Sequence, residues 1–127
     1  MLDYRDIIKY NNNMEEKIFT AEYTDEAIEQ LKELSEENQD KIIEAIGLFE
    51  HVGMAYKNIN DLGKGLFEIK PSGIRAYFMY DKNRRRIIII GFICLKKTQK
   101  APQQYKKTAR KNIEKYQKTM EAINANN

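Results

Sequence analysis

Residues 74–80 read IRAYFMY, residues 86–95 read RIIIIGFICL, and the run KKTQKAPQQYKKTARKNIEKY follows directly at residues 96–116. Side chains of the first segment alternate between the two faces of a strand, so Arg75 and Tyr77 share one face. The second segment is apolar on both faces, which predicts an interior strand. The order of these segments places a lysine-rich stretch at one edge of a sheet.

The remaining elements are predicted from periodicity and from capping residues. Thr24 is a predicted N-cap, because the acids that follow it suit the first turn of a helix. Pro102 suits the first turn of the last helix. The predicted elements are a strand at 17–23, helices to about residue 36 and at 38–51, a loop at 58–65, strands at 66–70, 74–80 and 87–95, and a helix ending near residue 122.

These elements predict a small α+β domain in which a mainly antiparallel sheet is packed by an N-terminal helical hairpin and followed by a C-terminal helix. Lys70 to Gly73 is predicted to form a type I turn with Pro71 in its second position. We expect an extension of unknown role at residues 1–16, a single domain at 17–122 and a frayed tail at 123–127. A chain of 127 residues is long enough for one modest core.

Charge is distributed unevenly along the chain. Residues 1–81 carry nine basic and 17 acidic side chains, whereas residues 82–127 carry 13 basic and two acidic ones. This asymmetry suggests an anionic partner for the second half. A solvated basic helix would give the same pattern.

Several classes of site are missing from the sequence. A single cysteine, Cys94, lies in an apolar segment and supports neither a disulfide framework nor a metal site, and His51 near a helix end is interpreted as structural. There is no glycine-rich phosphate loop and no nucleophile elbow. No secretory signal or membrane-span pattern is visible, so we expect a cytoplasmic protein. Since the motifs above are missing, we also expect no cofactor and no metal.

Cations and tyrosines remain as candidate functional groups. Lys70 ends one predicted strand, Arg75 begins the next, and Lys96 follows the interior strand. Preorganised cations of this kind stabilise the charge that grows on a phosphate during RNA cleavage. The alternative is that Arg75 pairs with Glu68 across the hairpin, that Tyr77 belongs to the core and that the lysines are solvated. Residue spacing alone favours neither interpretation.

The segments LFEIK, IRAYFMY, IIIIGFICLKKTQKAP and TARK resemble the phage-type HigB branch of the RelE/ParE superfamily of type II toxins, over about residues 17–118. This chain has Ile74 where the family has an aromatic residue, Ile90 where it has a histidine, and Tyr105 where the branch commonly has glutamate. The resemblance implies a RelE-like fold and the following roles. Catalytic candidates are Arg75, Lys70, Lys97 and Tyr105, and RNA-binding candidates are Lys96, Lys100, Tyr77, Arg110 and Lys111.

The resemblance further implies a toxin that enters the ribosomal A site and cleaves messenger RNA without a metal ion. It implies a cognate antitoxin, usually with a helix-turn-helix domain, through which operator DNA is bound. We expect that antitoxin to cover the basic edge of the sheet. Two other functions remain open at this point: a non-enzymatic, ParE-like inhibitor of DNA gyrase, and a degenerate homologue that only binds nucleic acid.

Overall fold

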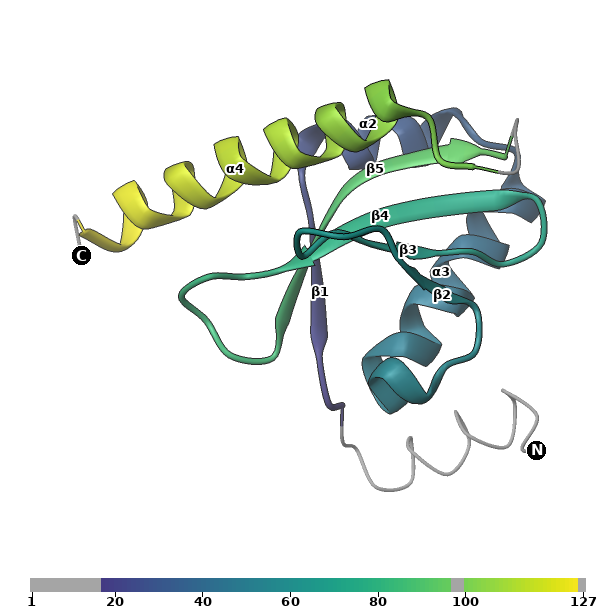
Figure 1. Cartoon of the computed structure of the whole chain (residues 1–127), viewed down its shortest axis with the longest axis horizontal. Coiled ribbons are helices and arrows are strands. Elements are labelled where there is room, and N and C mark those ends of the chain that lie inside the picture. Colours follow the sequence, from purple (N-terminus) through teal and green to yellow (C-terminus); the bar gives the residue numbers. More distant parts are fainter. Residues whose placement is uncertain (1–16, 97–99, 126–127) are drawn as a thin grey trace.

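The computed structural model describes residues 17–96 and 100–125, so the predicted extension at residues 1–16 and the catalytic candidate Lys97 lie outside the described residues. Figure 1 shows a twisted sheet with helices on both faces. The elements are β1 (Thr20–Tyr23), α2 (Asp25–Glu33), α3 (Glu36–Val52), the 3-10 helix η1 (Gly53–Ala55), β2 (Ile59–Asp61), β3 (Phe67–Ile69), β4 (Ile74–Tyr80), β5 (Ile87–Leu95) and α4 (Gln103–Ala125). The predicted α+β class is confirmed.

The five strands form one sheet in the order β1-β5-β4-β3-β2. All neighbouring pairs are antiparallel except β1 and β5, which are parallel. β5 therefore has a strand on either side, as its apolar sequence predicted. Because β4 and β5 are antiparallel, the start of β4 lies beside the end of β5, and Arg75 is paired with Cys94.

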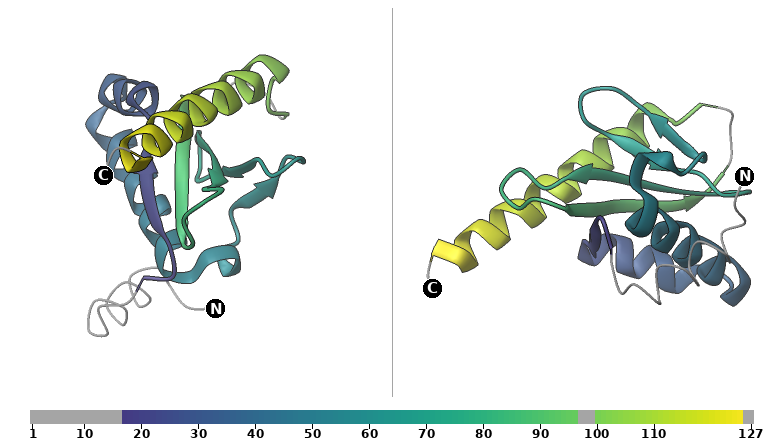
Figure 2. Two further views of the ribbon diagram at one scale, coloured as in Figure 1. Left: turned by 90° about the vertical axis from the view of Figure 1, so that its left-hand side faces the viewer. Right: turned by 90° about the horizontal axis from the view of Figure 1, so that it is seen from below.

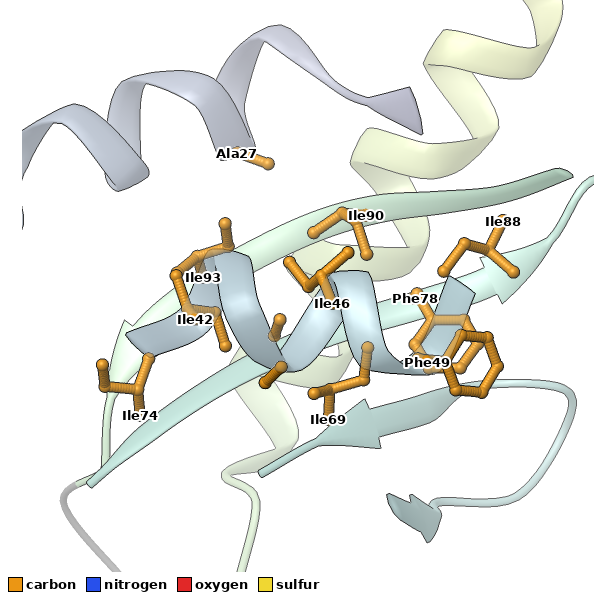
Figure 3. Packing of buried hydrophobic residues seen from close by; sticks show 12 residues of the cluster. Ala27, Ile42, Ile46, Phe49, Ile69, Ile74, Phe78, Ile88, Ile90 and Ile93 are labelled. Carbon is orange, nitrogen blue, oxygen red and sulfur yellow. The ribbon is translucent and has the colours of Figure 1, made fainter. Parts of the chain in front are cut away.

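Each face of the sheet has its own hydrophobic core. Helices α2 and α3 pack on one face and α4 on the other, as the two views of Figure 2 show. Figure 3 shows Ile42, Ile46 and Phe49 of α3 lying over the first face. The strand residues of that face include Ile74, Ala76, Phe78, Ile88, Ile90 and Ile93. Burial of each such isoleucine or phenylalanine contributes roughly 1.5–3 kcal/mol.

Polar residues fix where the first two helices begin. The Thr24 hydroxyl accepts a hydrogen bond from the Ala27 N–H at 3.1 Å, and the Ser35 hydroxyl accepts one from the Asn38 N–H at 3.2 Å. The Thr24 cap was predicted. Because Ser35 caps α3, α2 ends at Glu33 instead of near residue 36. No helix in the described part of the chain is both long and apolar enough to span a membrane.

A bulge interrupts the pairing of β4 with β5. Tyr77 is paired with Phe92 and Phe78 with Ile90, so Gly91 between them has no partner. An extra residue of this kind shifts the alternation of side chains along the strand. The phase of the inward-facing residues therefore changes at Gly91.

The same glycine is the place where α4 approaches the sheet most closely. A Cβ atom at Gly91 would lie 2.6 Å from Cγ1 of Ile113 and 2.7 Å from the Ala109 carbonyl oxygen. The buried Asn112 amide also donates a hydrogen bond to the Gly91 carbonyl at 2.9 Å. Gly91 thus sets the position of α4 relative to β5.

Two details differ from the sequence prediction. The loop predicted at 58–65 contains β2, which pairs with β3 at the sheet edge. Its Asn and Asp residues are typical of turns, and it is a strand only because β3 provides backbone partners. The predicted turn at Lys70 is also wrong by one residue, because the Ile74 N–H bonds to the Pro71 carbonyl at 3.2 Å. Gly73 is then the third residue, with φ +83°, as a type II turn requires.

Candidate functional site

A small hollow lies at one end of the sheet, where β3, β4, β5 and the start of α4 meet. Five of the sequence-predicted site residues line it, together with five residues that were not predicted as site residues. The predicted ones are Arg75, Tyr77, Lys96, Lys100 and Tyr105; the others are Glu68, Cys94, Leu95, Ala101 and Pro102. The structure therefore brings together the cations and tyrosines that the sequence left scattered over about 30 residues.

Arg75 is held firmly at the hollow. Its Nη1 donates hydrogen bonds to the carbonyl oxygens of Ile74 at 2.8 Å and Pro71 at 3.2 Å, and its Nε lies 3.8 Å from Oε2 of Glu68. The Arg75 side chain is only 14% exposed. A guanidinium fixed by backbone carbonyls and a carboxylate is preorganised, because it loses little freedom when it meets an anion. The Glu68 pairing considered from the sequence is therefore present, and it lies inside the hollow.

Glu68 is the residue that sequence reasoning missed as part of the site. It is 4% exposed, and its Oε1 accepts a hydrogen bond from the Asn60 amide at 2.8 Å. A buried carboxylate is retained only when it is paired and hydrogen-bonded. The sequence contained one signal of this role: Glu68 is an acid within the apolar run LFEI. It lies two residues before Lys70, so both side chains fall on the same face of the strand.

Three aromatic rings connect the floor of the hollow to α4. Tyr77 and Phe92 have ring centroids 5.8 Å apart, and Phe92 and Tyr105 have centroids 4.9 Å apart. Tyr77 is 1% exposed, so it forms the floor and offers no open ring face to a base. Burial, followed by the proximity of Cys94 and Glu68, raises the pKa of the Tyr77 hydroxyl well above its ordinary value. Tyr77 therefore keeps its proton near neutral pH.

The end of β5 and the start of α4 form the cationic wall of the hollow. The Lys96 N–H donates to the Gly73 carbonyl at 2.9 Å, which ties the end of β5 to the turn before β4. Cys94 is half-buried and lines the hollow beside Arg75, although it lies in an apolar segment of the sequence. Its environment is thus more polar than expected.

The N-terminus of α4 adds positive potential to the same place. Ala101 and Pro102, which precede the helix, line the hollow, and the Pro102 carbonyl accepts the N–H of Tyr105 at 3.1 Å. The first turn of α4 contains no acidic residue. A helix N-terminus carries a partial positive charge and unpaired N–H groups, which favour a phosphate.

Three other predicted residues lie outside the hollow. Lys70 directly follows β3, and its backbone N–H bonds to the Asn58 carbonyl at 2.8 Å. Arg110 donates to the carbonyl oxygens of Gly63 and Lys64, both at 2.9 Å. Lys111 is exposed on α4, on the side that faces α2. The described hollow thus contains Arg75 and Tyr105 of the four catalytic candidates.

A family model described as "Phage derived protein Gp49-like (DUF891)" matches residues 29–114, which is more than half of the chain. The chain belongs to this Gp49-like family. The match confirms the predicted membership of the RelE/HigB-type toxin superfamily. It spans all of β2 to β5 and the first half of α4, so the family region includes every described residue of the hollow.

Solved structures support the fold of this Gp49-like chain. One chain of the RelBE2 toxin–antitoxin complex of Mycobacterium tuberculosis matches with a TM-score of 0.53 at 17% sequence identity. The match covers 61% of the present chain and 98% of the other. At this identity the likeness concerns the fold. No curated protein matches the sequence.

Proposed function

We propose that this Gp49-like protein is the toxin of a type II toxin–antitoxin system and cleaves messenger RNA on the ribosome. The observation that carries the proposal is the hollow where Arg75, Lys96, Lys100 and the N-terminus of α4 converge on one small volume. Four sources of positive potential around one point suit a phosphate that gains charge in a transition state. Membership of a toxin superfamily supports the same function.

The reaction that fits these groups is attack of a ribose 2′-hydroxyl on the adjacent phosphate. The 2′-oxygen gives up its proton and bonds to phosphorus, the bond from phosphorus to the 5′-oxygen breaks, and the leaving oxygen takes up a proton. The products are a 2′,3′-cyclic phosphate and a 5′-hydroxyl. In this proposal the cations of the hollow stabilise the negative charge on the phosphoryl oxygens, so this step needs no metal ion.

We assign the proton transfers to two residues of the hollow. Glu68 is the proton acceptor, because it is the one carboxylate among the described residues of the hollow. Tyr105 is the donor to the leaving oxygen, in keeping with the tyrosine role implied by the superfamily. Tyr77 keeps its proton and donates a hydrogen bond to the carboxylate of Glu68. Lys97 and Lys70 complete the set of catalytic candidates from the sequence.

The partner implied by this function is a cognate antitoxin with a helix-turn-helix domain, which would bind operator DNA. An acidic segment of that partner would cover the same cations that bind RNA, because opposite charges favour this surface. Reversing the charges of Lys96 and Lys97 is therefore expected to weaken the toxin–antitoxin complex. Unchanged affinity of the double variant would place the antitoxin elsewhere.

The test is induction of the protein in growing cells, with wild type compared with Arg75→Ala. We expect wild type to arrest growth and to leave new transcript ends that primer extension detects, and Arg75→Ala to do neither while still binding its antitoxin. A gyrase supercoiling assay run beside it distinguishes the ParE-like alternative. Growth arrest without new transcript ends, or with inhibited supercoiling, would reject RNA cleavage.

A further inference from the structure

The loop between β2 and β3 has an unusual backbone. Gly63, Lys64 and Gly65 follow one another with φ values of +88°, +52° and +80°. Glycine adopts positive φ without steric cost, whereas a lysine with a Cβ atom does not. A strained residue of this kind, kept in place by its surroundings, is a reason to look for a function.

The surroundings of this loop hold its tip in place. Arg110 of α4 uses both terminal nitrogens on the carbonyl oxygens of Gly63 and Lys64, at 2.9 Å each. Asp61, the last residue of β2, accepts the N–H of Gly63 at 2.8 Å. Leu66, at the end of the loop, is fully buried in the cluster that contains Tyr77. The loop is thus fixed both to the helix and to the floor of the hollow.

The side chain that this arrangement presents is a solvent-exposed cation. Lys64 is exposed, and among the residues that the structure describes it forms no ion pair. Arg110, which holds it, lies five residues beyond Tyr105 on α4, or about 7.5 Å along the helix axis. No acidic residue occurs on α4 before Glu114. Every charged side chain of α4 between the hollow and Arg110 is therefore positive.

We propose that Lys64 is a second phosphate contact for the RNA strand whose scissile phosphate occupies the hollow, and that Arg110 is its positioning residue. This inference rests on the proposed function, since it concerns the same substrate. Lys64 contacts a neighbouring phosphate of the strand. In this proposal Arg110 acts through the loop, because its two terminal nitrogens hold the Gly63 and Lys64 carbonyls on either side of the strained N–Cα bond of Lys64.

The experiment measures binding of a single-stranded RNA that carries 2′-O-methyl groups throughout and cannot be cleaved. A length of about 12 nucleotides lies within the usual range of single-strand sites. Fluorescence anisotropy across a salt series gives both affinity and the number of phosphate contacts. We expect Lys64→Gly to weaken binding of two unrelated sequences equally and to lower the slope of log K against log salt by about 0.7. Thermal unfolding of Lys64→Gly should be unimpaired, because the variant removes the strain.

The controls separate this inference from the proposed function. Lys82→Ala removes an exposed lysine from the β4–β5 turn, at the opposite end of the strands from the hollow, and should leave the slope unchanged. Arg75→Ala should lower the slope as a contact inside the hollow. If Arg75→Ala lowers it and Lys64→Gly does not, the inference about Lys64 is wrong and the hollow still binds RNA. If wild type does not bind this RNA at low salt, the second contact is also rejected, whereas the cleavage assay in cells remains the test of the function.

A double-variant cycle tests the role of Arg110. If Arg110 only positions Lys64, Arg110→Ala weakens binding in the wild-type background and has no further effect in Lys64→Gly. Equal losses in both backgrounds would show that Arg110 contacts RNA itself and would overturn its positioning role. Retained slope and affinity in Arg110→Ala would overturn it as well.

Discussion

Replacing Gly91 by alanine tests the contact on which the geometry of the hollow depends. The added Cβ atom would lie 2.6 Å from Cγ1 of Ile113 and 2.7 Å from the Ala109 carbonyl. Both distances fall short of ordinary van der Waals contact, which begins at 3.4 Å, by about 0.7–0.8 Å. The carbonyl belongs to the helix backbone and cannot rotate away. α4 must therefore move outward as a body.

The cost follows from two contributions. Overpacking of this kind destabilises by about 1–3 kcal/mol. The outward shift also lengthens the 2.9 Å hydrogen bond from Asn112 to the Gly91 carbonyl, and an unpaired buried amide costs about 1–3 kcal/mol. We expect Gly91→Ala to lose roughly 2–6 kcal/mol of unfolding free energy. Tyr105 would move with the helix, and because sites of this kind tolerate about 0.5 Å of displacement, toxicity should fall too.

Urea denaturation of purified protein measures the loss directly. The matched control is Gly47→Ala in α3, where an added Cβ atom meets nothing within 4 Å. That change should stabilise the protein by about 0.5–1 kcal/mol, because alanine favours a helix over glycine. If Gly91→Ala is as stable as wild type, α4 does not pack closely on β5 at Gly91.

Three further predictions concern single side chains. Arg84 donates hydrogen bonds to both carboxylate oxygens of Glu22, at 2.8 and 2.9 Å, and holds the pKa of Glu22 below its usual 4.5. The pair therefore stabilises the folded protein fully above pH 4.5, and this stabilisation is lost as pH falls through the lowered pKa. Arg84→Gln should cost about 2 kcal/mol at pH 7 and flatten the acid limb of a stability–pH curve; an unchanged limb would contradict the pairing. Burial raises the pKa of Tyr116 from 10.0 to about 12, so the wild-type protein should lose stability as pH rises between these values. Chemical denaturation across this pH range should show a smaller loss for Tyr116→Phe. Thr24→Ala removes the N-cap of α2 and should cost about 1 kcal/mol in the same assay, whereas a cost near zero would mean that the hydroxyl does not cap the helix.

The sequence predicted the strands of the hollow well, because their patterns are local. Residues 74–80 alternate with period two, and residues 87–95 are apolar on both faces, so each pattern is visible in the chain itself. Thr24 is similarly local, since an N-cap is decided within three residues. These features brought Arg75, Tyr77 and Lys96 to the same edge in the prediction.

The missed features depend on partners that are distant in the chain. β2 is a strand because β3 pairs with it, and Asn60 matters because it reaches Glu68. Gly91 packs against Ala109 and Ile113 of α4, which lie 18 and 22 residues later in the chain. Arg110 bonds to the carbonyl oxygen of Lys64, 46 residues earlier in the chain, a contact that the sequence did not predict. Contacts of this kind leave no periodic pattern.

Cleavage of a messenger RNA that carries a single 2′-deoxynucleotide tests the central claim most directly. In a reconstituted translation reaction, wild-type protein should cut an all-ribose message and leave a 2′,3′-cyclic phosphate. A matched message with the deoxynucleotide immediately before the cut should stay intact at that position, and Arg75→Ala should cut neither. Cleavage at the deoxynucleotide, or an undiminished rate with Arg75→Ala, would contradict attack by the 2′-hydroxyl at the Arg75 hollow.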